Sequence, residues 1–142
     1  MFLLNQVKDL SVEQLNRVPP GFNNNIIWNL GHLISAQQNV CYVKTGLTPV
    51  ADENLISLYL SGSKPEAGVN EADIKIIKDI FISSIDHLQT DINRQAFRNY
   101  TPALMIQKVY GVQVNNIEDA LEYLLYHEGL HAAVINTLQR FI

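Results

Sequence analysis

The stretch IEDALEYLLYHEGLHAAVINTLQRF, residues 117–141, decides the fold of this protein. Its apolar residues recur at steps of three and four, which is the period of an amphipathic α-helix. Asn116 precedes the stretch as a candidate helix cap, and Glu118 and Asp119 lie in the first turn, where acidic side chains favour a helix start. The sequence therefore predicts a terminal helix over 117–141.

One face of this predicted helix carries two histidines one turn apart. The stripe that we expect to face the interior consists of Ala120, Leu124, His127, His131, Val134 and Leu138. Buried imidazoles bring polar nitrogens that are costly to bury without a partner. Because two histidines at i and i+4 on a helix form a metal clamp, the spacing predicts that His127 and His131 bind a metal ion.

The same five residues, His127 to His131, also spell H-E-x-x-H, the signature of zincin metalloproteases. A catalytic zinc normally has three protein ligands, and in zincins the third ligand follows the motif. The tail after His131 reads AAVINTLQRFI and contains no His, Asp, Glu or Cys. The third ligand must therefore come from upstream, unlike in a zincin.

Helical periodicity also dominates the rest of the chain, and no stretch shows the sustained alternation of a strand. Long helices are predicted over 26–45 and 71–92, with shorter helices over 2–10, after the cap Ser11, and over 53–60. The segment 94–116 contains Pro102 and Gly111 and is predicted to be irregular. The fold class is all-α.

Three long helices and a shorter, broken amino-terminal one predict a four-helix bundle that forms a single domain over residues 1–142. The connection of about 25 residues between helices 26–45 and 71–92 is too long for a hairpin. It predicts a lengthwise crossover between the second and third helices of the bundle. The core stripe predicted for helix 71–92 is Ile74, Ile77, Phe81, Leu88 and Ile92.

Composition narrows the classes of partner. The net charge is −4 and the Lys and Arg residues are scattered, so no basic face is expected for nucleic acid or for a membrane surface. No apolar run approaches the ~20 residues of a membrane span, and MFLLNQVKDL lacks the features of a signal peptide. The single cysteine, Cys41, is predicted to be a small buried apolar residue. Small molecules and protein partners remain as candidates, and we expect the protein to be cytoplasmic.

His32 is the candidate for the third metal ligand. It lies near the start of predicted helix 26–45, and Trp28 and Asn39 share its face of that helix. With His127 and His131 it completes a site of three imidazoles. Trp28, Asn39 and Tyr126 are the candidate pocket residues.

Two glycines and one more histidine accompany these ligands. Gly31 and Gly129 stand inside predicted helices, where glycine costs about 1 kcal/mol relative to alanine. Close approach of a neighbouring helix and ordinary helix packing both explain them. His87, which lies beside Asp86 in helix 71–92, is predicted to be at the surface.

A site of three neutral imidazoles leaves a divalent ion its full charge and an open position. Such an ion lowers the pKa of bound water towards ~7, or holds a thiol as thiolate. Glu128 follows a ligand directly and is the candidate catalytic base; a hydrogen-bond partner of a metal ligand and a solvent-exposed flank are the alternatives. Because imidazoles bind metal only when deprotonated, metal loss is expected below about pH 6.

These residues resemble the DinB-like superfamily of four-helix-bundle metalloproteins. The likeness covers nearly the whole chain: NNNIIWNLGHLISAQQNV is similar to the family's second helix, and IEDALEYLLYHEGLHAAVINTLQR to its last helix with H-x-x-x-H. The resemblance implies metal ligands at His32, His127 and His131, nickel or zinc as the ion, an up-up-down-down bundle and often a homodimer. The short first helix departs from the family pattern.

Three functions fit these expectations. The first is a metal-dependent transferase that binds a low-molecular-weight thiol and passes it to a small reactive molecule, as the resemblance implies. The second is a metal-dependent hydrolase in which bound water attacks and Glu128 takes the proton. The third is a non-catalytic stress or binding protein whose metal is structural.

Overall fold

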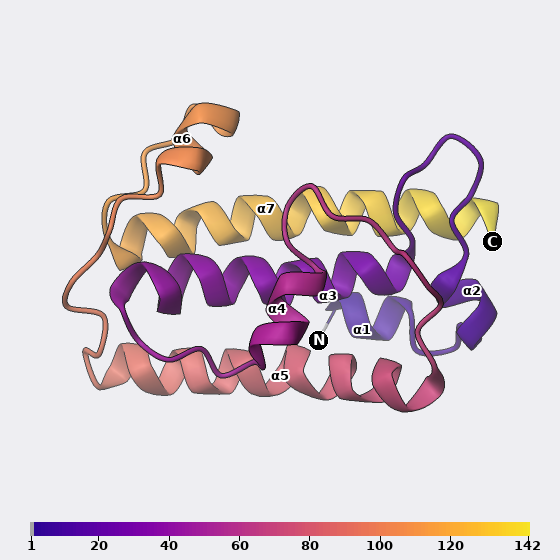
Figure 1. The fold of residues 1–142 in the computed structure, drawn as a ribbon, viewed down its shortest axis with the longest axis horizontal. Coiled ribbons are helices and arrows are strands. Elements are labelled where there is room, and N and C mark those ends of the chain that lie inside the picture. Colours follow the sequence, from indigo (N-terminus) through magenta and orange to yellow (C-terminus); the bar gives the residue numbers. More distant parts are fainter. Residues whose placement is uncertain (1) are drawn as a thin grey trace.

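The computed structural model describes residues 2–142, and this part of the chain is all-α, with no strand (Figure 1). Three long helices lie lengthwise and form the body of the molecule: α3 (Ile26–Gln37), α5 (Glu71–Asn93) and α7 (Ile117–Leu138). Helix α3 packs against both α5 and α7. Two short helices, α1 (Phe2–Gln6) and α2 (Val12–Asn16), complete the amino-terminal part. No helix in residues 2–142 is both long and apolar enough to cross a membrane.

The predicted helix over 26–45 is continuous but not uniform. After α3 the chain passes through a π-helical turn, η1 (Gln38–Tyr42), and a 3-10 turn, η2 (Val43–Thr45), and Gly46 at φ 73° ends the run. The buried Gln38 side chain accepts hydrogen bonds from the backbone N–H groups of Val50 and Ala51. The π-helical turn therefore ties the following connection to this helix.

Helix caps lie where the sequence predicts them. Ser11 and Gln14 form a reciprocal capping box at the start of α2. The Asn25 side chain accepts from Trp28 N, and that of Asn116 accepts from Asp119 N. These side chains satisfy backbone N–H groups that a helix start would otherwise leave unpaired, which explains why the helices begin there.

Two predicted helix ends and one segment predicted to be irregular need correction. Helix α1 ends at Gln6 rather than near residue 10, and α4 (Glu53–Leu58) ends before residue 60. Helix α6 (Leu104–Tyr110) forms inside the segment predicted to be irregular. This helix fits between Pro102 and Gly111, and Ile106 is its one buried residue, so it shows no apolar stripe from which to predict a helix.

The helices do not follow the expected up-up-down-down order, which would place the second and third helices of the bundle, α3 and α5, antiparallel. Helices α3 and α5 run in the same direction, and α7 runs in the opposite one (Figure 1). A hydrogen bond of 2.9 Å from Tyr42 Oη to Asp91 Oδ2 joins the far ends of the α3 run and of α5. Helices α3 and α5 run in the same direction because the connection 46–70, which carries α4, returns along the bundle to the end where α3 began.

The core stripe of α7 also differs in one position. Ala120, His127 and Leu138 are buried as expected, and Leu124 and His131 are partly buried. Val134 is 37% exposed, whereas Ile135 is fully buried against α3 and α5 residues. The buried face of α7 is therefore turned towards Ile135, because α3 packs along α7 and α1 bonds to the carboxyl end of the same helix.

Helix α1 fills only part of the space beside α5 and α7. Its Leu3 joins the core cluster that contains Phe81 of α5 and Ile135 of α7. Gln6 donates to Asn136 Oδ1 and accepts from Gln139 through its backbone carbonyl. Because these partners lie near the carboxyl end of α7, the short α1 covers that end and leaves the opposite half uncovered.

Candidate metal centre

The three predicted ligands come together inside the bundle. His32 projects from α3, and His127 and His131 project from successive turns of α7. Each offers one ring nitrogen, and these three atoms lie within 4.8 Å of one another. The Nε2 atoms of His32 and His127 are 3.3 Å apart. Two nitrogens bound tetrahedrally to one zinc ion at ~2.0–2.1 Å are also separated by about 3.3 Å, so this pair fits a shared ion.

A backbone carbonyl fixes the protonation of His32. Its Nδ1 atom lies 2.8 Å from the carbonyl oxygen of Tyr59. Because a carbonyl oxygen only accepts, Nδ1 must carry the proton, and the lone pair on Nε2 is free to bind a metal. Such a bond to the second ring nitrogen is a general feature of metal-binding histidines.

Gly31 allows Tyr59 to reach this position. A Cβ atom at residue 31 would lie 2.6–2.7 Å from ring atoms of Tyr59, so only glycine leaves room for the ring. The close approach proposed for Gly31 is therefore observed. No atom lies within 4 Å of the corresponding point at Gly129, where the close-approach explanation is wrong.

The other two histidines differ in their second nitrogen. His131 Nδ1 lies 2.7 Å from Oδ1 of Asn29, a buried residue of α3. His127 Nδ1 is buried and has no hydrogen-bond partner among the residues described. The second ring nitrogen is therefore held by a hydrogen bond in two of the three imidazoles, whereas His127 is held by packing and by the 3.3 Å contact between its Nε2 and that of His32.

Burial keeps this cluster neutral. Desolvation lowers the pKa of His32, partly opposed by the bond to Tyr59. Desolvation and then the charge of His32 lower the pKa of His127 to about 4. The pKa of His131 falls to about 3, from desolvation and then from the charges of His127 and His32. All three rings are thus deprotonated at neutral pH and can donate lone pairs to a cation.

Aromatic rings surround the cluster. Trp28 stacks on His32 with ring centroids 4.8 Å apart and planes at 8°, and its Nε1 atom donates to Ser63 Oγ. Tyr123 stacks on His127 at 5.4 Å, and the ring of Tyr110 from α6 lies 6.4 Å from His127. Burial raises the pKa of Tyr123, so its phenol stays protonated. These rings shield the histidines from water.

The predicted pocket residues fall in different places. Trp28 contacts the cluster directly. Tyr126 is exposed and contacts Tyr110 at a centroid distance of 6.2 Å, and Asn39 donates to the carbonyl of Ser35 one turn earlier in its helix. No hydrogen bond links either of these two side chains to a histidine within residues 2–142.

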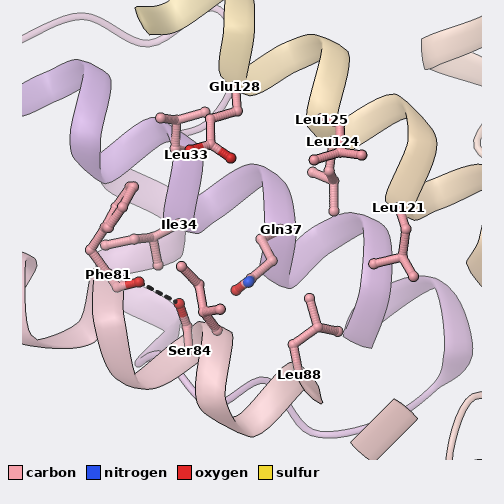
Figure 2. Close-up of a pocket in the computed structure, with 11 residues that line it drawn as sticks. Leu33, Ile34, Gln37, Phe81, Ser84, Leu88, Leu121, Leu124, Leu125 and Glu128 are labelled. Carbon is pink, nitrogen blue, oxygen red and sulfur yellow. Dashed lines mark hydrogen bonds between the residues drawn. The ribbon is translucent and has the colours of Figure 1, made fainter. Parts of the chain in front are cut away.

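Glu128 lies on a different flank of α7 from the histidines. It is exposed and lines a groove of about 230 Å³ between α3, α5 and α7. Figure 2 shows it with three leucines of α7, opposite Phe81, Ser84 and Leu88 of α5. No hydrogen bond or ion pair in the described part of the chain connects Glu128 to the histidine cluster. Its predicted role as a base receives no support from this position.

Two residues that the sequence analysis placed outside the metal site, Cys41 and His87, lie where it predicted. Cys41 is fully buried, and burial raises the pKa of its thiol to about 12, which makes it inert at neutral pH. His87 is exposed on α5 and bonds to the carbonyl of Ser83. Neither belongs to the metal centre.

Sequence reasoning missed four residues around the histidines. Asn29 and Tyr59 form hydrogen bonds to the rings of His131 and His32, and Tyr110 and Tyr123 pack on His127. Asn29 left a signal, because it is a polar residue inside the apolar run IIWNLGHLI. Tyr59 acts through its backbone, which carries no signal in the sequence.

The architecture and the cluster together define a class: a helical protein with a three-histidine centre built from two facing helices. A comparison with protein families agrees with this assignment, since the DinB superfamily profile matches residues 3–135. The chain belongs to the DinB superfamily, and its histidine cluster can hold a metal ion. Neither the curated proteins nor the solved structures gave a match.

Proposed function

We propose that this protein is a metal-dependent transferase that binds a low-molecular-weight thiol and passes it to a small reactive molecule. The observation that carries the proposal is the neutral cluster of His32, His127 and His131, whose nitrogens converge within 4.8 Å. Three neutral ligands leave the charge of a divalent ion uncompensated, and that charge favours a thiolate. Resemblance to thiol-handling members of the superfamily supports the same reaction.

A divalent ion, nickel or zinc in this proposal, supplies the positive charge that stabilises the thiolate when it is bound. In the reaction the thiol loses its S–H proton to solvent. Its sulfur then forms a bond to the electrophilic carbon, and the leaving group departs with its electron pair. Trp28 and Tyr123 keep water away from two of the ligand rings, which preserves the lone pairs for the ion. The protein acts on small molecules as a homodimer in this proposal.

The hydrolase alternative needs a base beside the cluster. Glu128 was its candidate, and this side chain lines the apolar groove on another flank of α7. No observation favours this alternative over the transferase. A structural metal in a non-catalytic protein is the third reading, and one set of measurements separates all three.

The test uses the cobalt(II)-loaded protein, because cobalt reports its ligands by visible absorption. We expect cysteine or glutathione to produce a sulfur-to-metal absorption band and to be transferred to 1-chloro-2,4-dinitrobenzene in a metal-dependent reaction. His32→Ala should abolish both effects, and the neighbouring exposed residue of α7 gives the control Glu128→Gln, which should retain both.

Other outcomes would refute the transferase. Ester hydrolysis without thiol, lost in Glu128→Gln, would establish the hydrolase. A bundle that melts when the metal is removed, with no thiol effect on the cobalt spectrum, would establish a structural ion.

A further inference from the structure

Asn29 is a buried polar residue between apolar neighbours of α3, one turn before His32. Its side chain is 1% exposed, and both ends of its amide are used. The Nδ2 atom donates to the carbonyl oxygen of Asn25 over 2.7 Å. The Oδ1 atom lies 2.7 Å from Nδ1 of His131 on α7. The side chain therefore bridges the backbone of α3 to a metal ligand on the opposite helix.

The carbonyl of Asn25 decides which way this bridge runs. A carbonyl oxygen cannot donate, so the amide nitrogen of Asn29 must face it. The amide oxygen of Asn29 then faces His131, and this oxygen only accepts. His131 must therefore carry its proton on Nδ1, which leaves the lone pair on Nε2.

Two further asparagines hold this arrangement in place. Asn25 donates through Nδ2 to the carbonyl of Asn16 over 2.9 Å. Asn16 in turn makes two bonds to the backbone of Val69, which lies just before α5. The amide that faces His131 is thus the last member of a chain that starts at the entry to another long helix. Such a chain leaves Asn29 little freedom to turn.

We propose that Asn29 is a positioning residue of the metal centre, which holds the ring of His131 in the tautomer whose Nε2 atom can bind the ion. The proposal rests on the metal-binding role of the cluster. Asn29 itself contacts no reacting atom. It does for His131 what the carbonyl of Tyr59 does for His32.

Removing this contact has a defined cost. In Asn29→Leu, a substitution of similar volume, His131 loses its acceptor and can rotate or take the other tautomer. Loss of such a partner typically lowers metal affinity 10- to 100-fold. Asn29→Asp offers a second comparison, because the carboxylate still accepts from His131 but repels the carbonyl of Asn25.

The chain provides a matched control on the same helical run. Asn39 donates to the carbonyl of Ser35 one turn earlier, as Asn29 does to Asn25, and contacts no histidine. Asn39→Leu therefore removes the same kind of intrahelical bond without touching the metal centre. It should leave the zinc affinity within about threefold of wild type.

The experiment measures zinc affinity by competition with a chromophoric chelator for wild type, Asn29→Leu and Asn39→Leu. A 10- to 100-fold loss in Asn29→Leu alone supports the proposal. Equal affinities in all three would overturn it, and so would an equal loss in both variants. If wild type binds no zinc, the metal-binding function fails by itself.

A measurement on wild type keeps the inference open to refutation if Asn29→Leu does not fold. Nitrogen-15 NMR distinguishes the two tautomers of a neutral imidazole. We expect His131 to be protonated on Nδ1 both in EDTA-treated protein and with zinc added. A proton on Nε2 in the EDTA-treated protein would show that Asn29 does not set the tautomer.

Discussion

His127 and Glu128 are adjacent in the sequence, and they belong to two regions with opposite properties. His127 is 2% exposed, packed between aromatic rings and other histidines, and its pKa is lowered to about 4. Glu128 is exposed at the edge of an open groove lined mainly by leucines and isoleucines. One residue along a helix is a rotation of about 100°, which suffices to move a side chain from one region to the other.

The two regions are covered differently. The histidine flank of α7 faces α3, and Tyr59, Trp28 and α6 surround it. The other flank faces α5 across the groove (Figure 2). No residue of α1 (Phe2–Gln6) is among those that line this groove. A motif that reads as one unit, H-E-x-x-H, is thus split by the fold into a buried part and an exposed part.

The largest expected effect is a difference in zinc affinity between variants of the neighbouring residues His127 and Glu128. His127→Ala should lower zinc affinity by more than about 100-fold, because a three-ligand centre loses one ligand. Glu128→Gln should leave affinity within about twofold, since its side chain lies in the other region. Elemental analysis and chelator competition measure both. Equal losses in the two variants would mean that Glu128 reaches the ion.

A pH titration tests the buried region alone. In EDTA-treated protein His127 and His131 have lowered pKa values, so the unfolded chain binds more protons than the folded one below pH 6.5. Stability is fully present above pH 6.5 and falls as the pH drops towards 4, by about 1.4 kcal/mol per pH unit for each histidine. Urea denaturation between pH 7 and pH 4.5 measures this slope.

The same pKa values change one expectation for the metal. In the folded protein, protons compete with a metal ion for the ring nitrogens only near the lowered pKa values, about 4 for His127 and about 3 for His131. Metal loss is therefore expected at a lower pH than the value of about 6 that the sequence predicts. A stability that does not vary over this pH range would contradict the neutral, buried cluster.

Substitutions at two glycines, Gly31 and Gly129, should change the free energy of unfolding by an intermediate amount. Gly31→Ala places a methyl group 2.6–2.7 Å from the Tyr59 ring, and this overpacking should cost about 1–3 kcal/mol. Gly129→Ala meets no atom within 4 Å on the exposed side of α7 and should stabilise the protein by about 1 kcal/mol. Chemical denaturation measures both. Stabilisation by both substitutions would show that Tyr59 does not rest on Gly31.

The smallest effect is expected in the groove. Leu125 is 73% exposed there, so Leu125→Gln should change the free energy of unfolding by no more than about 0.5 kcal/mol. Urea denaturation together with the sedimentation coefficient measures the outcome. A loss of more than about 1 kcal/mol, accompanied by dissociation, would show that a second copy of the chain covers this groove in solution.

The sequence predicted much of this arrangement because the relevant signals are local. Asn25 and Asn116 mark helix starts, and the i, i+4 spacing of His127 and His131 places both rings near the same face. His32 could be chosen because it follows one such cap in an apolar helix. Each of these inferences depends on a few neighbouring residues.

What the sequence did not reveal depends on contacts between distant segments. Val134 is exposed and Ile135 is buried because the positions of α3 and α1 decide which flank of α7 is covered. The direction of α5 depends on the path of the connection 46–70. The contact of Tyr59 with His32 uses a backbone carbonyl, which every residue type has, so the sequence does not indicate it. Helix α6 is short and mostly exposed, so it lacks the periodic pattern on which a prediction rests.

The contacts that build the histidine cluster join residues far apart along the chain. They span 27 positions for His32 and Tyr59, 95 for His32 and His127, and 102 for Asn29 and His131. Contacts of such separation form only after long loops close, which places the cluster late in folding. An ion that binds only the finished cluster leaves the folding rate unchanged and slows unfolding. Bound metal would then govern how long a folded molecule survives, and not how quickly it is made.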